Sequence, residues 1–147
     1  MQEEAKAREI IDALAAKPIA RWLNYSADWK DGALLHHLGF AEEHIGNPGI
    51  RALHGGVIAT FLEFSAQVEI AVSLGKPILF KAVSISTDYM TSSKAADMTA
   101  RVTIARAARR IAFLDATGWQ DDPAKPVASA RICLRTGAPA QSSPALK

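Results

Sequence analysis

The segment from Val57 to Leu74, VIATFLEFSAQVEIAVSL, constrains the fold more than any other part of the sequence. It is apolar around nearly the whole circumference of a helix, and such a helix is buried on most of its faces. A glycine and, two residues later, a proline follow it, as is typical of a helix C-terminus. Glu63, Gln67 and Glu69 interrupt the segment, and their cost in lipid argues against a membrane span. We therefore expect a domain built around one buried helix.

Much of the remaining sequence has the apolar-polar alternation of β-strands. From Met98 to Ile104, for example, every second residue is apolar. Short turns separate these runs, which is typical of an antiparallel meander. We expect strands at 33–38, 84–89, 98–104, 110–119 and 127–135, an N-terminal helix from Glu3 to Lys17 that Pro18 stops, and a helical turn from Ile19 to Tyr25. This order predicts an α+β fold in which one sheet wraps around the central helix.

The composition restricts the class of protein. The 147 residues suffice for one domain, which we place at residues 1–136, and the polar, proline-containing sequence 137–147 is expected to be a flexible tail. A net charge of +2 argues against a dedicated nucleic-acid-binding protein. The single cysteine, Cys133, excludes an internal disulfide and is expected to be buried. Because the charged N-terminus lacks an apolar signal region, we expect a cytoplasmic protein without membrane partners.

The sequence Leu53-His54-Gly55-Gly56 directly precedes the central helix. Two glycines allow the backbone to approach a ligand closely. The first amides of a helix have no intrahelical acceptor, so they can hold the oxyanion that forms on an attacked carbonyl. The alternative interpretation is that the glycines only form a tight turn into the helix. The local pattern by itself leaves both interpretations open.

Glu63 is the strongest candidate for a chemical role. A carboxylate in the middle of an apolar helix is costly to bury without a partner or a function. Such a group can activate water or attack an acyl carbon. Glu69 lies on a different face of the helix and is expected to face solvent or a partner. Seven residues separate Gly56 from Glu63, which is roughly 10 Å along a helix. One carbonyl cannot bridge that gap, so we expect a dimer in which Glu63 of one chain meets the glycine amides of the other.

The run HGGVIATFLEF, residues 54–64, resembles the signature of the PaaI-type (phenylacetate-pathway, 4-hydroxybenzoyl-CoA thioesterase-like) hotdog-fold acyl-CoA thioesterases. In that family His-Gly-Gly is followed seven residues later by an acid. Residues 87–90 are similar to the family's strand that ends in a tyrosine and a hydrophobic residue. Residues 102–119 are similar to its next hairpin, and residues 127–130 to its last strand. The resemblance covers about residues 32–135.

The resemblance implies a hotdog fold, here with an extra N-terminal helix, and hydrolysis of an acyl-CoA without a cofactor. The face of the central helix that carries Phe61, Phe64 and Val68 leads us to expect a medium-chain or aromatic acyl group. Glu63 takes the place of the catalytic acid, as general base or nucleophile. Gly55 and Gly56 supply backbone amides to the thioester carbonyl, and His54 positions the thioester or the acyl group. The central helices of the family pack across a homodimer with shared active sites, in agreement with the distance argument, and hotdog dimers also associate into tetramers.

The sequence departs from the family pattern at several positions. Many relatives have aspartate in place of Glu63. Many also have asparagine six residues before the histidine, where this chain has Pro48, and Asn47 substitutes for it only if the loop is rearranged. The arginine that often follows the tyrosine-hydrophobic pair is Thr91 here, and the family's Gly-Arg in the hairpin is Ala-Arg. Among the central-helix side chains, Phe64 is a candidate contact for the acyl group.

Cationic side chains are candidates to meet the phosphates of CoA: Arg106, Arg109, Arg110 and Lys94. Each one taken singly is more readily interpreted as solvated surface charge. We expect no metal site, because His36 and His37 are adjacent in a strand and point to opposite faces, while His44 lies in an unpartnered loop.

Two other functions remain open from the residues. An acyl-thioester dehydratase pairs a histidine with an acid, as His54 and Glu63 would allow, although the adjacent glycines fit a thioesterase better. A hotdog dimer that binds acyl-CoA or another apolar ligand without turnover is the second alternative. The departures at Pro48 and Thr91 favour this binding protein, and the carboxylate of Glu63 argues against it.

Overall fold

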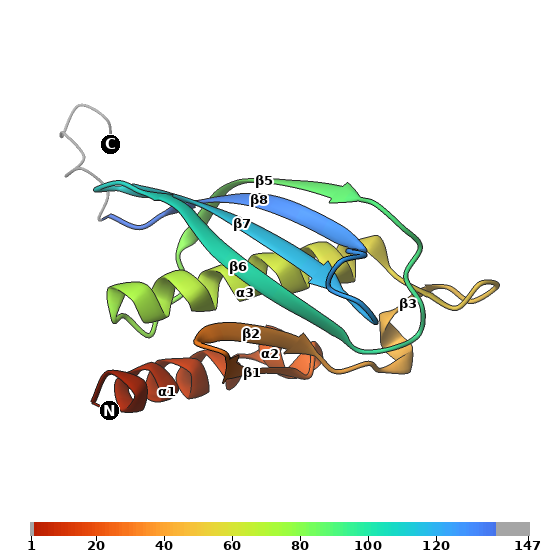
Figure 1. Cartoon of the computed structure of the whole chain (residues 1–147), viewed down its shortest axis with the longest axis horizontal. Helices are drawn as coiled ribbons and strands as arrows, with labels where there is room; N and C mark the ends of the chain where they lie inside the picture. Colours follow the sequence, from red (N-terminus) through yellow and green to blue (C-terminus); the bar gives the residue numbers. More distant parts are fainter. Residues whose placement is uncertain (1, 138–147) are drawn as a thin grey trace.

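The computed structural model describes residues 2–137, in which one antiparallel sheet curves around a long helix, α3 (Gly55–Leu74) (Figure 1). The six strands of the sheet lie in the order β1 (Tyr25–Lys30), β2 (Ala33–Leu38), β6 (Met98–Ala107), β7 (Ile111–Trp119), β8 (Ala128–Arg135) and β5 (Lys81–Tyr89). Two helices, α1 (Gln2–Ala15) and α2 (Pro18–Trp22), precede the sheet. The predicted α+β architecture is confirmed. Most of the predicted tail lies outside the described residues.

Helix α3 forms the centre of the core, as predicted. Phe61 and Leu62 are fully buried, and Gly75 ends the helix in the left-handed conformation at φ 68°. Gly118 of β7 lets α3 approach the sheet, because a Cβ there would lie 3.2 Å from a Leu62 methyl carbon and 3.0 Å from the sulfur of Met98. By length and composition α3 is apolar enough to cross a membrane, yet most of its apolar window is buried inside the protein, as in a core helix.

The N-terminal region differs from the prediction. The first helix ends at Ala15, and the second covers only Pro18–Trp22 instead of reaching Tyr25. Tyr25 starts strand β1, which the sequence did not predict and which pairs along its full length with β2. Asn24 adopts φ 49°, and its left-handed backbone turns the chain from helix to strand. A short hairpin also occupies part of the predicted loop, formed by β3 (Ile45–Asn47) and β4 (Ala52–Leu53).

Strand β5 is an edge strand whose inner face is uncovered. Ile85 and Tyr89 lie directly opposite Ile132 and Ala128 of β8, which are fully buried on the helix side of the sheet. Directly paired residues share a face, so Ile85 and Tyr89 also face the helix layer. They are nevertheless 39% and 54% exposed, because α3 packs mainly under β6, β7 and β8. The edge of the sheet therefore presents an apolar strip that the described part of the chain does not cover.

A chain of hydrogen bonds between Tyr25, His36 and Glu69 ties the N-terminal hairpin to α3. The hydroxyl of Tyr25 lies 2.7 Å from Nδ1 of His36, and Nε2 of His36 lies 2.8 Å from the Glu69 carboxylate. Burial, with the nearby Glu69 charge as a second cause, raises the pKa of the Tyr25 phenol well above its ordinary value. Glu69, which was expected to face solvent or a partner, is partly exposed, and its carboxylate accepts a hydrogen bond from the fully buried His36.

His44 is also partnered, contrary to the prediction. It ends a short 3-10 helix (Glu42–His44) and is fully buried. Its Nδ1 accepts a hydrogen bond from the backbone N–H of Ala41 at 3.1 Å. The ring proton is therefore on Nε2, which donates to the backbone carbonyl of Trp22 at 2.9 Å. His44 thus fixes the end of α2 against the loop that leads to the candidate site.

Candidate active site

His54 caps the N-terminus of α3 with its own side chain. It occupies the N-cap position in an extended conformation, and its Nδ1 accepts the backbone N–H of Gly56 at 2.9 Å. The amide of Gly56 is thus already engaged. Because Nδ1 acts as an acceptor, the proton of the neutral ring lies on Nε2. The exposed His54 ring therefore presents a donor, rather than a base, at the start of the helix.

The backbone of Gly55 is held from two directions. Its carbonyl accepts a hydrogen bond of 2.7 Å from the hydroxyl of Tyr89 at the end of β5, and the carbonyl of His54 accepts the N–H groups of Val57 and Ile58. The N–H of Gly55 has no acceptor among the described residues. It is the free donor at the positive end of a 20-residue helix. Within the pair of glycines, the available amide is therefore that of Gly55.

The β3–β4 hairpin sets the position of His54. The N–H of His54 donates to the carbonyl of His44 at 2.8 Å. Gly46 of β3 lies directly against His54, since a Cβ at Gly46 would lie 2.6 Å from its Cα and 2.8 Å from its Cβ. Only glycine provides this close approach. Gly46 therefore belongs to the framework of the site, although the sequence analysis did not single it out.

Glu63 lies two turns into α3 on the helix face that also carries Gly56 and Thr60. It is half-buried, and no side chain among the described residues bonds to its carboxylate. The next polar side chains of the helix differ in this respect. Gln67 makes two hydrogen bonds of 2.7 Å to the backbone of Phe80, and Glu69 bonds to His36. Glu63 is therefore a carboxylate kept in an apolar element without a structural partner among residues 2–137.

Two other candidate residues are engaged elsewhere in the described structure. Asn47 is exposed, and its side-chain oxygen accepts the N–H of Gly49 in its own loop. Phe64 is 4% exposed and packs edge-on against Tyr25, so it is a core residue in this chain and has no surface to offer a ligand.

The cationic candidates are divided between the two ends of the sheet. Arg109 and Arg110 occupy the turn between β6 and β7. This turn lies at the end of the sheet where β8 finishes and β5 begins at Lys81. Tyr89, which contacts Gly55, is at the other end of β5, roughly 26 Å from Lys81 at about 3.3 Å per residue. Arg106 lies on the same hairpin, while Lys94 pairs with Asp121. The structure thus does not bring the hairpin arginines to Gly55 of the same chain.

Within residues 2–137, no group of three or more His, Cys, Asp or Glu side chains is arranged to hold a metal ion. Cys133 is buried and unpaired with another cysteine, as the sequence predicted. Tyr89, like Gly46, is a site residue that sequence reasoning missed. It stood in the tyrosine-hydrophobic pair that resembled the family, but nothing in the local pattern connected it with Gly55.

The comparison with protein families identifies the group. The model of the thioesterase superfamily matches residues 51–127, just over half of the chain. The chain belongs to the thioesterase superfamily. The matched segment includes His54, Gly55, Glu63 and Tyr89, whereas Gly46, which lies against His54, precedes it. Helix α2 lies outside it. No curated protein matches the sequence.

Solved structures related to thioesterases match nearly the whole chain. A thioesterase-superfamily protein from Bordetella bronchiseptica has a TM-score of 0.80 at 22% identity, covering 90% of this chain and 98% of its own. A phenylacetic acid degradation-related protein from Ralstonia eutropha has 0.75 at 17% identity, covering 88% and 98%. The E. coli PaaI protein has 0.67 at 18% identity, covering 92% and 95%. These likenesses confirm the predicted hotdog fold and, at the level of the fold, the resemblance to PaaI.

Proposed function

We propose that this thioesterase-superfamily protein hydrolyses an acyl-CoA to the free acid and CoA, with Glu63 as the catalytic carboxylate. The observation that supports this most is the unpartnered Glu63 on the helix face that leads to the free amide of Gly55. A half-buried carboxylate and a preorganised donor are the two groups that attack on a thioester carbonyl requires.

The chemistry follows from the two groups. Glu63 takes a proton from water as the water oxygen bonds to the acyl carbon. The Gly55 N–H, assisted by Nε2–H of His54, stabilises the negative charge on the carbonyl oxygen. The carbon–sulfur bond then breaks, and the proton passes from Glu63 to the departing thiolate. Direct attack by the carboxylate, with hydrolysis of the resulting anhydride, uses the same residues.

We further propose that each site is shared between two subunits. Within one chain Gly56 and Glu63 are roughly 10 Å apart along the helix axis, too far to serve one carbonyl. The bare apolar edge of β5 offers a surface for a second copy, because an unpaired edge strand is a ready template for strand pairing. An antiparallel arrangement of the two α3 helices would place Glu63 of each near Gly55 of the other.

The arrangement of His54 favours hydrolysis over dehydration. A dehydratase needs an imidazole nitrogen free to remove a carbon-bound proton. Nδ1 of His54 already accepts the Gly56 N–H, and Nε2 carries the ring proton. Neither nitrogen is available as a base in this conformation, whereas both the ring N–H and the Gly55 N–H suit an oxyanion.

The first experiment measures thiol release from a panel of acyl-CoAs by wild type and Glu63→Gln. We expect a loss of roughly 100-fold or more in kcat, about 2.7 kcal/mol or more of barrier. Glu69→Gln is the control, because it makes the same change in a carboxylate that bonds to His36 instead. Binding of the esters without thiol release by the folded wild-type protein would contradict the proposal and indicate a binding protein.

Sharing of the site is tested by mixing two inactive variants. Gly55→Pro removes the free N–H at the first helical position, where proline is best tolerated, and Gly55→Ala is its control because it retains the N–H. In a heterodimer of Glu63→Gln and Gly55→Pro, shared sites leave one site with both lesions and one intact. We therefore expect activity to reappear on mixing after mild unfolding and refolding. No recovery in a verified heterodimer would show that each site lies within one chain.

A further inference from the structure

A groove of about 420 Å³ opens beside the candidate active site, between α2 and the N-terminal end of α3. Its apolar walls are Ile19 and Trp22 of α2, Ile45 of β3 and Val57 of α3. The Ile19 and Trp22 side chains are 37% and 43% exposed, so both present apolar surface to the groove without being part of the core. Concave apolar surface of this size suits part of a small ligand.

The groove borders the groups that are proposed to hold the thioester. His54, whose Nε2–H is proposed to assist the oxyanion, and Gly56, next to the free amide of Gly55, line it, and Thr60 lies on the helix face that carries Glu63. Its one carboxylate, Glu43, is on an exposed residue. A thioester whose carbonyl lies at the helix terminus therefore has an apolar channel next to its acyl carbon, and that channel belongs to the same chain as the amide.

Trp22 is held in place by a buried histidine. The ring of His44 packs edge-to-face against the indole with centroids 4.7 Å apart, and its Nε2–H donates to the Trp22 carbonyl. A wall fixed in this way keeps its shape when a ligand binds, which reduces the entropy lost on binding. Trp22 and the rest of α2 lie outside residues 51–127, the segment that matches the superfamily. This side of the groove is therefore formed by residues outside the matched segment.

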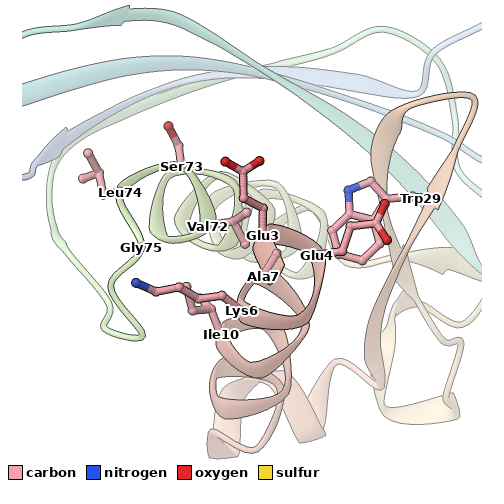
Figure 2. Close-up of a pocket in the computed structure, with 10 residues that line it drawn as sticks. All are labelled: Glu3, Glu4, Lys6, Ala7, Ile10, Trp29, Val72, Ser73, Leu74 and Gly75. Atoms are coloured by element: carbon pink, nitrogen blue, oxygen red, sulfur yellow. The ribbon is translucent and has the colours of Figure 1, made fainter. Parts of the chain in front are cut away.

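A second groove, of about 480 Å³, lies at the far end of α3 and does not suit the same role. Figure 2 shows its lining, with α1 contributing Glu3, Glu4 and Lys6, with Ser73, Leu74 and Gly75 at the end of α3 on the left of the view, and with Trp29 of β1 on the right. Charged side chains rather than apolar walls dominate its α1 side. Val72, which lines this second groove, is also about 16 residues along α3 from Gly56, roughly 24 Å at about 1.5 Å per residue.

We propose that the acyl chain of the substrate lies in the groove between α2 and α3, against Trp22 and Ile19, and that these two side chains set the preference for acyl length. This inference rests on the proposed thioesterase function, but the binding of the acyl group is separable from its hydrolysis. Each methylene that enters the groove is expected to tighten binding by about 4-fold, the equivalent of ~0.8 kcal/mol. The gain should stop at the length at which the chain leaves the groove.

The test uses thioether analogues of acyl-CoA, S-ethyl-CoA and S-hexyl-CoA, which cannot be hydrolysed. Isothermal titration calorimetry measures their affinity for wild type, Trp22→Ala and Trp29→Ala. Trp29 is the matched control, because it is an indole of similar exposure, 38%, at the other groove. We expect Trp22→Ala to weaken S-hexyl-CoA by at least about 10-fold and S-ethyl-CoA by less than about 2-fold, and Trp29→Ala to change neither.

A second variant tests the groove by filling it. Ile19→Trp should lower the affinity for S-hexyl-CoA while sparing S-ethyl-CoA. Equal weakening of both analogues by Trp22→Ala, unchanged affinity in both variants, or failure of the wild type to discriminate between the analogues would each overturn the assignment. Thiol release from acetyl-CoA and hexanoyl-CoA is measured separately. Length-selective binding without any thiol release would refute the proposed hydrolysis and leave the groove assignment standing.

Discussion

The close approach of Gly46 to His54 makes the candidate site sensitive to a single methyl group. In Gly46→Ala the new Cβ would lie 2.6 Å from the Cα of His54, whereas ordinary contact begins near 3.4 Å. The two backbones must therefore separate by about 0.8 Å, the difference between these distances. The neighbour is main chain rather than the end of a flexible side chain, so it cannot rotate away. Overpacking of this kind costs roughly 1–3 kcal/mol.

The same shift is expected to reach the chemistry. His54 caps α3 and adjoins the Gly55 amide, and a misplacement of about 1 Å in a catalytic group can cost roughly 100-fold in rate. Gly49→Ala is the control three residues away, because its Cβ would meet only the side-chain oxygen of Asn47 at 3.3 Å. Urea unfolding followed by tryptophan fluorescence gives the stability, and thiol release gives kcat/KM. If Gly46→Ala matched Gly49→Ala in both, the argument that this contact positions the site would be refuted.

Three further predictions concern hydrogen bonds. Tyr89→Phe removes the bond to the Gly55 carbonyl, so the free energy of unfolding should fall by about 0.5–1.5 kcal/mol, and kcat should fall with little change in KM because the Gly55 amide is held less firmly. His54→Ala removes the cap of α3 and should lower the free energy of unfolding by about 0.5–2 kcal/mol, measured in the same way. The pKa of Tyr25 is raised in the folded protein, so the folded protein keeps the phenol proton that the unfolded chain releases near pH 10.0. The buried phenol therefore contributes its full stability below that pH. This stability is lost as the pH rises above it. Urea titrations between pH 8 and 11 should show a steeper decline for wild type than for Tyr25→Phe, and equal declines would exclude this linkage.

The central helix and the meander after it were predictable because their patterns are strong. Val57 to Leu74 is apolar on nearly all sides, and Met98 to Ile104 alternates with a period of two. Strand β1 was missed although its sequence, YSADWK, alternates apolar and polar residues. Tyr25 was assigned to the helical turn before it, and the remaining alternation is short and buries only Ala27.

The candidate site was predictable in its residues and less so in its contacts. The pair of glycines and Glu63 were identifiable from spacing, but the engagement of the Gly56 amide by His54 depends on a side-chain rotamer that no local pattern reports. Phe64 was misjudged for a related reason. On a helix that is apolar all round, periodicity does not separate the residues that face a ligand from those that face the core. The bonds from Tyr89 and His44 join segments far apart in the sequence, which one sequence does not reveal.

The uncovered inner face of β5 has a consequence for the time that a newly made subunit spends alone. The nine-residue strand β5 carries the exposed apolar side chains Val83, Ile85 and Tyr89. An exposed edge strand with apolar side chains is also a surface through which chains aggregate. If two copies associate through this face, as proposed above, their meeting is second order in chain concentration, so the bare edge persists longer when synthesis is slow. Expression rate would then decide how long each chain keeps this edge exposed.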